Sequence, residues 1–150
     1  MAKNGVRLFG SDEAILHVGE GLLSLSLPRE EWTHEAHLAA CLWIVRDRPD
    51  IAPELQMRKI ISSYNEAIGG VNDDSQGYHE TITQVFIAAV RAHLANDAAD
   101  VSLQDAVNSL LLSPRGHRNL PLNHYSRELL FSVAARRDFV APDLRPLAEI

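Results

Sequence analysis

Proline and glycine residues divide this 150-residue chain into segments of helical length, and their spacing limits the folds open to it. Pro28 begins one such segment, and Pro49 stops it just after Asp47. Pro53 begins the next segment, which ends at the Gly69-Gly70 pair. Proline is favoured in the first turn of a helix, and glycine is favoured just after the last turn. The spacing therefore predicts one helix from Pro28 to about Asp47 and a second helix from Pro53 to the glycine pair.

Two more long helices are predicted after the polar loop 71–78. A stripe of apolar residues and histidines at helical spacing predicts a helix from about Tyr78 to Ala95. Ser102 and Asp105 have the spacing of a capping box, which predicts a helix that ends near Pro114. Short helices are expected around 125–131 and 132–139, followed by an extended tail.

The first 27 residues carry weaker signals than the rest of the chain. A short helix from Asp12 to Glu20 is expected, followed by alternating Leu and Ser residues over 23–27. A single strand there would lack a partner, so the segment is predicted to be an extended arm. The fold class is therefore all-α, a bundle of about four main helices with a short-helix and extended C-terminal wrap. We expect one helical domain over 1–150, with an arm (1–27), a core (28–139) and a tail (140–150).

Composition excludes several classes of protein. The chain is 46% hydrophobic and 23% charged, which is typical of globular proteins rather than disordered ones. The formal net charge is −6, which argues against a nucleic-acid partner. The charge is uneven, because residues 113–150 contain six arginines and only four acidic residues. This basic tail is expected either to pair with the acidic body or to hold an anion.

Cys41 is the only cysteine, so no intramolecular disulfide can form. It lies among alanine, leucine and tryptophan, a setting that raises the pKa of a thiol and makes it inert. No apolar stretch reaches the roughly 18 residues that a bilayer span needs, so no membrane partner is expected. No signal-peptide pattern precedes the core either. We expect a bacterial-type cytoplasmic location.

Histidines form the clearest candidate site. His34 and His37 lie three residues apart on a predicted helix, so their imidazoles can face one ion. His79 and Glu80 lie where the polar loop enters the third helix. If the first and third helices are neighbours, His34, His37 and His79 are the candidate ligands of a divalent transition metal (zinc, iron, nickel or manganese). Glu80 would be a fourth ligand or a general base acting on metal-bound water.

Arg127 is the candidate anion-binding residue, because its planar guanidinium suits a carboxylate or phosphate. Glu80 and Arg127 are thus the candidate catalytic pair for a small anionic substrate. Each of these residues also has a structural interpretation. A histidine on a buried helix is often a hydrogen-bonded core residue, and Arg127 can simply pair with the body of the protein. A third possibility is an anion site formed by Arg115, Arg118 and Arg127.

Several motifs together resemble a family of short, functionally uncharacterised bacterial helical proteins. The resemblance spans about Leu16 to Leu147, and it rests on the sequences WTHxAHL at 32–38, YNE at 64–66, GYHETIT at 77–83, YSRExLFS at 125–132 and FVxPDLxPL at 139–147. It implies a cytoplasmic, mainly helical, stand-alone domain and carries no catalytic role. The chain also resembles, in architecture alone, the DinB-type bundles, which hold a metal with three histidines. Their histidines four residues apart are not found here.

Two hypotheses of function follow. In the first, the protein binds a transition metal through the His/Glu cluster and acts as a metal-dependent enzyme. In the second, it is a non-catalytic interaction module, and the His/Glu/Arg/Tyr cluster is a buried hydrogen-bond network. Its partner would then bind an apolar face, with homodimerisation as one form of that binding.

Overall fold

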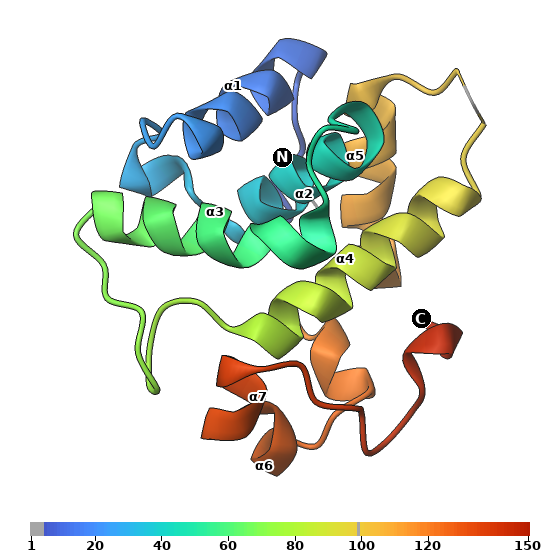
Figure 1. Ribbon diagram of the computed structural model, residues 1–150. Coiled ribbons are helices and arrows are strands. Elements are labelled where there is room, and N and C mark those ends of the chain that lie inside the picture. The colour runs from blue at the N-terminus through green and yellow to red at the C-terminus, as the bar shows by residue number, and fades with distance from the viewer. Residues whose placement is uncertain (1–4, 99) are drawn as a thin grey trace.

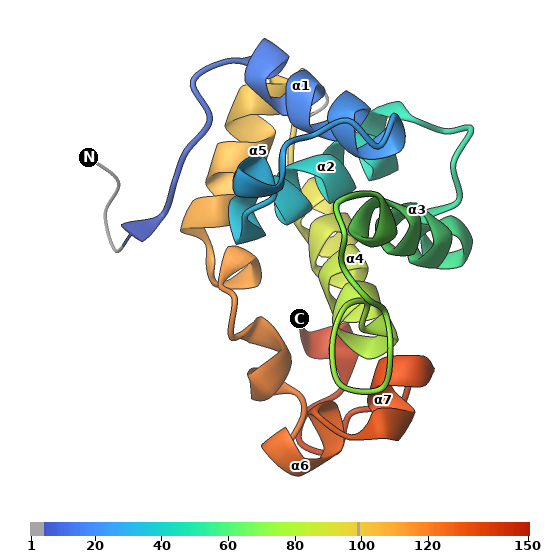
Figure 2. The same cartoon turned by 90° about the vertical axis from the view of Figure 1, so that its left-hand side faces the viewer.

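The computed structural model describes residues 5–98 and 100–150 (Figures 1 and 2). The described chain is all-helical, which confirms the predicted fold class. Its five longer helices are α1 (Asp12–Leu23), α2 (His34–Asp47), α3 (Pro53–Ala67), α4 (Glu80–Ala95) and α5 (Leu103–Leu112). Two short helices follow, α6 (Arg127–Leu130) and α7 (Val133–Arg137). Within the described residues, 3₁₀ turns connect or follow these helices at η2 (Arg29–Glu31), η3 (Pro114–Gly116), η4 (Leu120–Asn123) and η5 (Leu147–Glu149).

Side chains at the N-caps explain where most of these helices begin. An oxygen of the cap side chain accepts a hydrogen bond from a backbone N–H of the first turn, which would otherwise lack a partner. Serine or threonine does this at α1, α2, α5, α6 and α7, through Ser11, Thr33, Ser102, Ser126 and Ser132. At α4 the cap is the imidazole of His79. The helix start predicted at Ser102 is confirmed, because the Ser102 hydroxyl accepts a hydrogen bond from the backbone N–H of Asp105.

The predicted helix from Pro28 was wrong at its start. Pro28 precedes the single turn η2, and α2 begins only at His34, after the cap at Thr33. Pro28 has a ψ of 143°, which is extended rather than helical. A proline can therefore mark a turn as well as a helix, and the cap at Thr33 decides where α2 starts.

The N-terminal region is also more helical than predicted. The first helix, α1, continues to Leu23, and its buried residues Ile15, Val18 and Leu22 belong to the core. The alternating segment after it forms a turn rather than an extended arm, with Leu25 at a φ of 61°. That turn returns the chain to α1, because the backbone N–H of Leu27 donates to the carbonyl of Gly21 over 3.1 Å.

Helix α2 lies at the centre, with α1, α3, α4 and α5 around it (Figures 1 and 2). Nine of its fourteen residues are buried, among them Leu38, Leu42 and Ile44. The short helices α6 and α7 lie at the far end of the molecule, beside the start of α4 (Figures 1 and 2). They enclose a second, smaller core around Val85, Tyr125 and Leu130. No helix in the described chain is long and apolar enough to cross a membrane.

Candidate functional site

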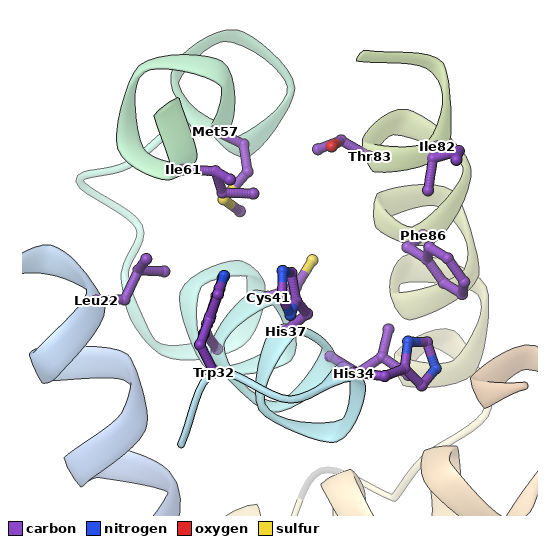
Figure 3. A pocket seen from close by; sticks show the side chains of 12 residues that line it. Leu22, Trp32, His34, His37, Cys41, Met57, Ile61, Ile82, Thr83 and Phe86 are labelled. Carbon is purple, nitrogen blue, oxygen red and sulfur yellow. The ribbon is translucent and has the colours of Figure 1, made fainter. Parts of the chain in front are cut away.

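A cavity of about 300 Å³ lies between α2, α3 and α4 (Figure 3). Its walls combine aromatic rings with aliphatic side chains. The residues that line it are Leu22, Trp32, His34, His37, Leu38, Ala40, Cys41, Met57, Ile61, Ile82, Thr83 and Phe86. Among these described residues there is no aspartate, glutamate, lysine or arginine. The cavity is therefore apolar apart from two imidazoles, one indole N–H, one hydroxyl and one thiol.

His37 is positioned from both sides. Its Nδ1 lies 2.7 Å from the carbonyl oxygen of Thr33, one turn earlier on the chain. Its ring stacks against the indole of Trp32, with ring centroids 3.7 Å apart and planes at 30°. Trp32 in turn meets Tyr64 edge to face at 5.2 Å. The ring of His37 is thus held in one orientation at the cavity wall, beside Cys41 (Figure 3).

The electrostatics of the cavity favour neutral side chains. Burial lowers the pKa of His37 to about 4, although the hydrogen bond to Thr33 acts in the opposite direction. Burial also raises the pKa of the Cys41 thiol to about 12. At neutral pH the imidazole is therefore uncharged and the thiol protonated, so Cys41 is not a nucleophile.

His34 lines the same cavity but is directed elsewhere. Its Nε2 lies 2.9 Å from the carbonyl oxygen of Gly116 in η3, so it joins α2 to the segment after α5. Its ring meets the edge of Phe86 at 5.5 Å. Burial lowers the pKa of His34 as well. Figure 3 shows the rings of His34 and His37 beside different neighbours, so the spacing of three residues does not by itself bring them to one point.

His79 does not line this cavity, and both of its ring nitrogens are engaged. Nδ1 accepts a hydrogen bond from the backbone N–H of Ile82 over 3.1 Å and thereby caps α4. Nε2 lies 2.7 Å from the carbonyl oxygen of Leu130, at the end of α6. The side chain thus links the start of α4 to the end of α6. A metal ion could bind this imidazole only if one of the two hydrogen bonds broke.

Glu80 belongs to a polar cluster at the start of α4. The hydroxyl of Tyr78 donates to its Oε1 over 2.5 Å, and the amide of Gln84 donates to its Oε2 over 3.3 Å. The guanidinium of Arg58, on α3, lies 3.7 Å from the same Oε2. Its carboxylate is therefore already paired within the protein, and Glu80 is not among the residues that line the cavity.

The arginines predicted to bind an anion lie apart from the cavity. Arg127 begins α6 and is exposed. Arg115 donates to the backbone oxygen of Ile150 over 3.2 Å. Arg118 lines a different hollow of about 440 Å³, together with His34 and Glu35. The carboxylate of Glu35 makes that hollow a poor site for an anion.

The predicted metal ligands are therefore only partly together. His34 and His37 share the cavity, whereas His79 and Glu80 face other partners. In residues 5–98 and 100–150, no three His, Cys, Asp or Glu side chains form a group able to hold a metal ion. Metal binding by the chain stays a prediction. His17 and His117 are exposed.

Sequence reasoning missed most of the cavity wall. Trp32 and Thr83 lie inside the motifs that carry the family resemblance. Their place in those motifs is the sequence signal that could have identified them as cavity residues. Met57 and Ile61, four residues apart on α3, carry no signal beyond ordinary helical periodicity.

Comparison with known proteins adds no assignment. No family model matches the chain, and neither the curated proteins nor the solved structures contain a match. The resemblance to a bacterial family stays a prediction.

Proposed function

We propose that the protein is a non-catalytic binder of a small, neutral, largely apolar molecule, which it holds in the cavity between α2, α3 and α4. The observation that carries this proposal is a cavity of about 300 Å³ whose described lining residues include no charged side chain. Ligand pockets typically measure roughly 300–1,000 Å³ and are mostly apolar with a few polar groups. The cavity fits this pattern at the lower end of the size range, which favours a ligand of one or two rings.

The properties of the two reactive groups favour binding over catalysis. A general base works best when its pKa lies near the working pH, and the pKa of His37 is lowered to about 4. A nucleophilic cysteine needs an accessible thiolate, and the pKa of Cys41 is raised to about 12. Both groups are therefore suited to contact a ligand rather than to react with it.

The proposal is closer to the non-catalytic hypothesis from the sequence than to the metal-dependent enzyme. That hypothesis gives the His/Glu/Arg/Tyr cluster a structural role. The hydrogen bonds of His79 support this role, and so does His124, whose Nδ1 lies 3.0 Å from the carbonyl oxygen of Arg145. A cytoplasmic location and homodimerisation stay predictions.

Indole tests the proposal, because it is neutral, bicyclic and soluble enough for calorimetry. We expect wild-type protein to bind indole with one site per chain. Ile61→Trp fills the cavity from α3 and should abolish binding. Leu55→Trp places the same side chain on the same helix at a position that is 83% exposed, and it should bind indole as wild type does. Arg127→Ala should also leave binding unchanged.

Two results would refute the proposal. One is the absence of indole binding by folded wild-type protein together with no binding of other neutral one- or two-ring compounds. The other is undiminished binding by Ile61→Trp, which would place the ligand outside the cavity.

A further inference from the structure

The polar atoms that face the cavity differ in whether they can donate or accept a hydrogen bond. A carbonyl oxygen only accepts, so the imidazole nitrogen beside it must carry the proton. The carbonyl of Thr33 lies 2.7 Å from Nδ1 of His37, which leaves the lone pair on Nε2. Because the pKa of His37 is lowered to about 4, this neutral tautomer is the form present at neutral pH. Nε2 of His37 is therefore an acceptor.

His34 and Thr83 on the cavity wall give their protons to the backbone in the same way. Nε2 of His34 donates to the carbonyl of Gly116 over 2.9 Å. The hydroxyl of Thr83 donates to the carbonyl of His79 over 2.8 Å. The other donors of the described wall are the indole N–H of Trp32 and the thiol of Cys41, and a thiol is a weak donor. The imidazole of His37 thus offers a ligand an acceptor at Nε2, because its proton is on Nδ1.

Aromatic rings surround the acceptor of His37. Trp32 stacks on the imidazole itself, and Phe86 stands across the cavity beside His34 (Figure 3). Aromatic rings pack favourably against each other in offset-stacked or edge-to-face arrangements. An apolar ligand that is itself aromatic gains such contacts, and Met57 and Ile61 cover its other side.

We infer that the ligand is a neutral aromatic compound with an N–H or O–H group on its ring, and that this group donates a hydrogen bond to Nε2 of His37. This inference rests on the proposed function. A compound with acceptors only would leave Nε2 buried without a partner, which is costly. An anion would enter a site whose described wall has no cationic side chain.

Indole and benzofuran form a matched pair for the test. They have the same size and shape, but benzofuran has an oxygen where indole has its N–H. We expect wild-type protein to bind indole about tenfold more tightly than benzofuran, the ratio typical of one hydrogen bond. Indole-2-carboxylate should bind more weakly than indole.

Two variants of His37 assign the selectivity to one atom. His37→Asn keeps a donor near Thr33, but its shorter side chain places no acceptor at the position of Nε2, so it should bind indole and benzofuran equally. His37→Gln places an amide oxygen near the position of Nε2 and should retain a preference for indole. A ¹⁵N NMR spectrum of histidine-labelled wild-type protein supplies a second measurement. The Nε2 resonance of His37 should shift on adding indole and shift less with benzofuran.

The outcomes separate this inference from the proposed function. Equal affinity of wild type for indole and benzofuran, both blocked in Ile61→Trp, would overturn the inference and leave the cavity as the binding site. Tighter binding of indole-2-carboxylate than of indole would overturn the inference that the ligand is neutral. Preserved selectivity in a folded His37→Asn variant would show that another group accepts the bond. If neither these two compounds nor any other neutral one- or two-ring compound binds, the proposed function fails as well.

Discussion

The imidazole of His79 donates a hydrogen bond from Nε2 to the carbonyl oxygen of Leu130 over 2.7 Å, and this bond ties the start of α4 to the end of α6. The other ring nitrogen caps α4. One side chain thus performs two structural tasks, and both need the neutral imidazole. The sequence suggests His79 as a metal ligand, and in this fold its side chain connects the helical core to the C-terminal wrap by hydrogen bonds.

Replacing His79 separates its two tasks. His79→Asn keeps an oxygen that can cap α4 but loses the bond to Leu130, whereas His79→Ala loses both. We expect His79→Ala to lower the free energy of unfolding by about 1 kcal/mol more than His79→Asn, the usual value of an N-cap. Urea unfolding at pH 7.5, followed by circular dichroism, measures the difference. Equal losses in both variants would show that the cap contributes nothing.

Stability should fall in mild acid. The pKa values of His34, His37 and His79 are all lowered by burial, so the folded protein binds fewer protons than the unfolded chain. The neutral histidines therefore contribute their full share of the free energy of unfolding above pH 6.5, the pKa of histidine in the unfolded chain. That share is lost as the pH falls below 6.5. For His37 the loss continues to about pH 4 and amounts to roughly 3 kcal/mol.

His37→Gln tests this assignment, because glutamine does not titrate. Its free energy of unfolding should depend less steeply on pH between 6.5 and 4 than that of wild type. Urea titrations at four pH values in this range give the two slopes. Parallel slopes would mean that His37 is not protonated on unfolding in this range.

Gly19 allows α1 to approach α2. A Cβ at this position would collide with the indole of Trp43, which is only 5% exposed. We expect Gly19→Ala to lower the free energy of unfolding by about 1–3 kcal/mol, as overpacking does. Gly10→Ala is the control, because a Cβ there meets no atom within 4 Å. A Gly19→Ala variant as stable as this control would show that α1 can shift without cost.

Metal content tests the hypothesis of a metal site directly. A metal at His79 must break its cap or its bond to Leu130. We therefore expect the melting temperature of the purified protein to be unchanged by excess chelator, and His79→Ala to have the same metal content as wild type. One equivalent of a transition metal per wild-type chain, lost in His79→Ala, would establish the metal site and overturn the structural role of His79.

Local signals account for much of the fold. The start of α3 at Pro53, its end before Gly69 and the capping of α5 by Ser102 all follow from residues within one turn of the helix end. The same kind of signal misled at Pro28, where the chain makes a single 3₁₀ turn before α2. Pro28 and Thr33 are both residues that favour a helix start, and α2 begins after Thr33. Trp32, just before this start, packs against Tyr64 of α3.

The sequence by itself determined that the chain is helical, where most helices end and that Cys41 is buried and inert. It also singled out His34 and His37 as candidate metal ligands, and the structure places both in the wall of the cavity. Only the tertiary structure decided which partners each histidine meets. Helix caps depend on residues a few positions apart, whereas the cavity exists because α2, α3 and α4 leave space where they pack. The tautomer of His37 depends on its contact with the carbonyl of Thr33. His79 lies away from the cavity because it bonds to Leu130 of α6, some fifty residues further along the chain.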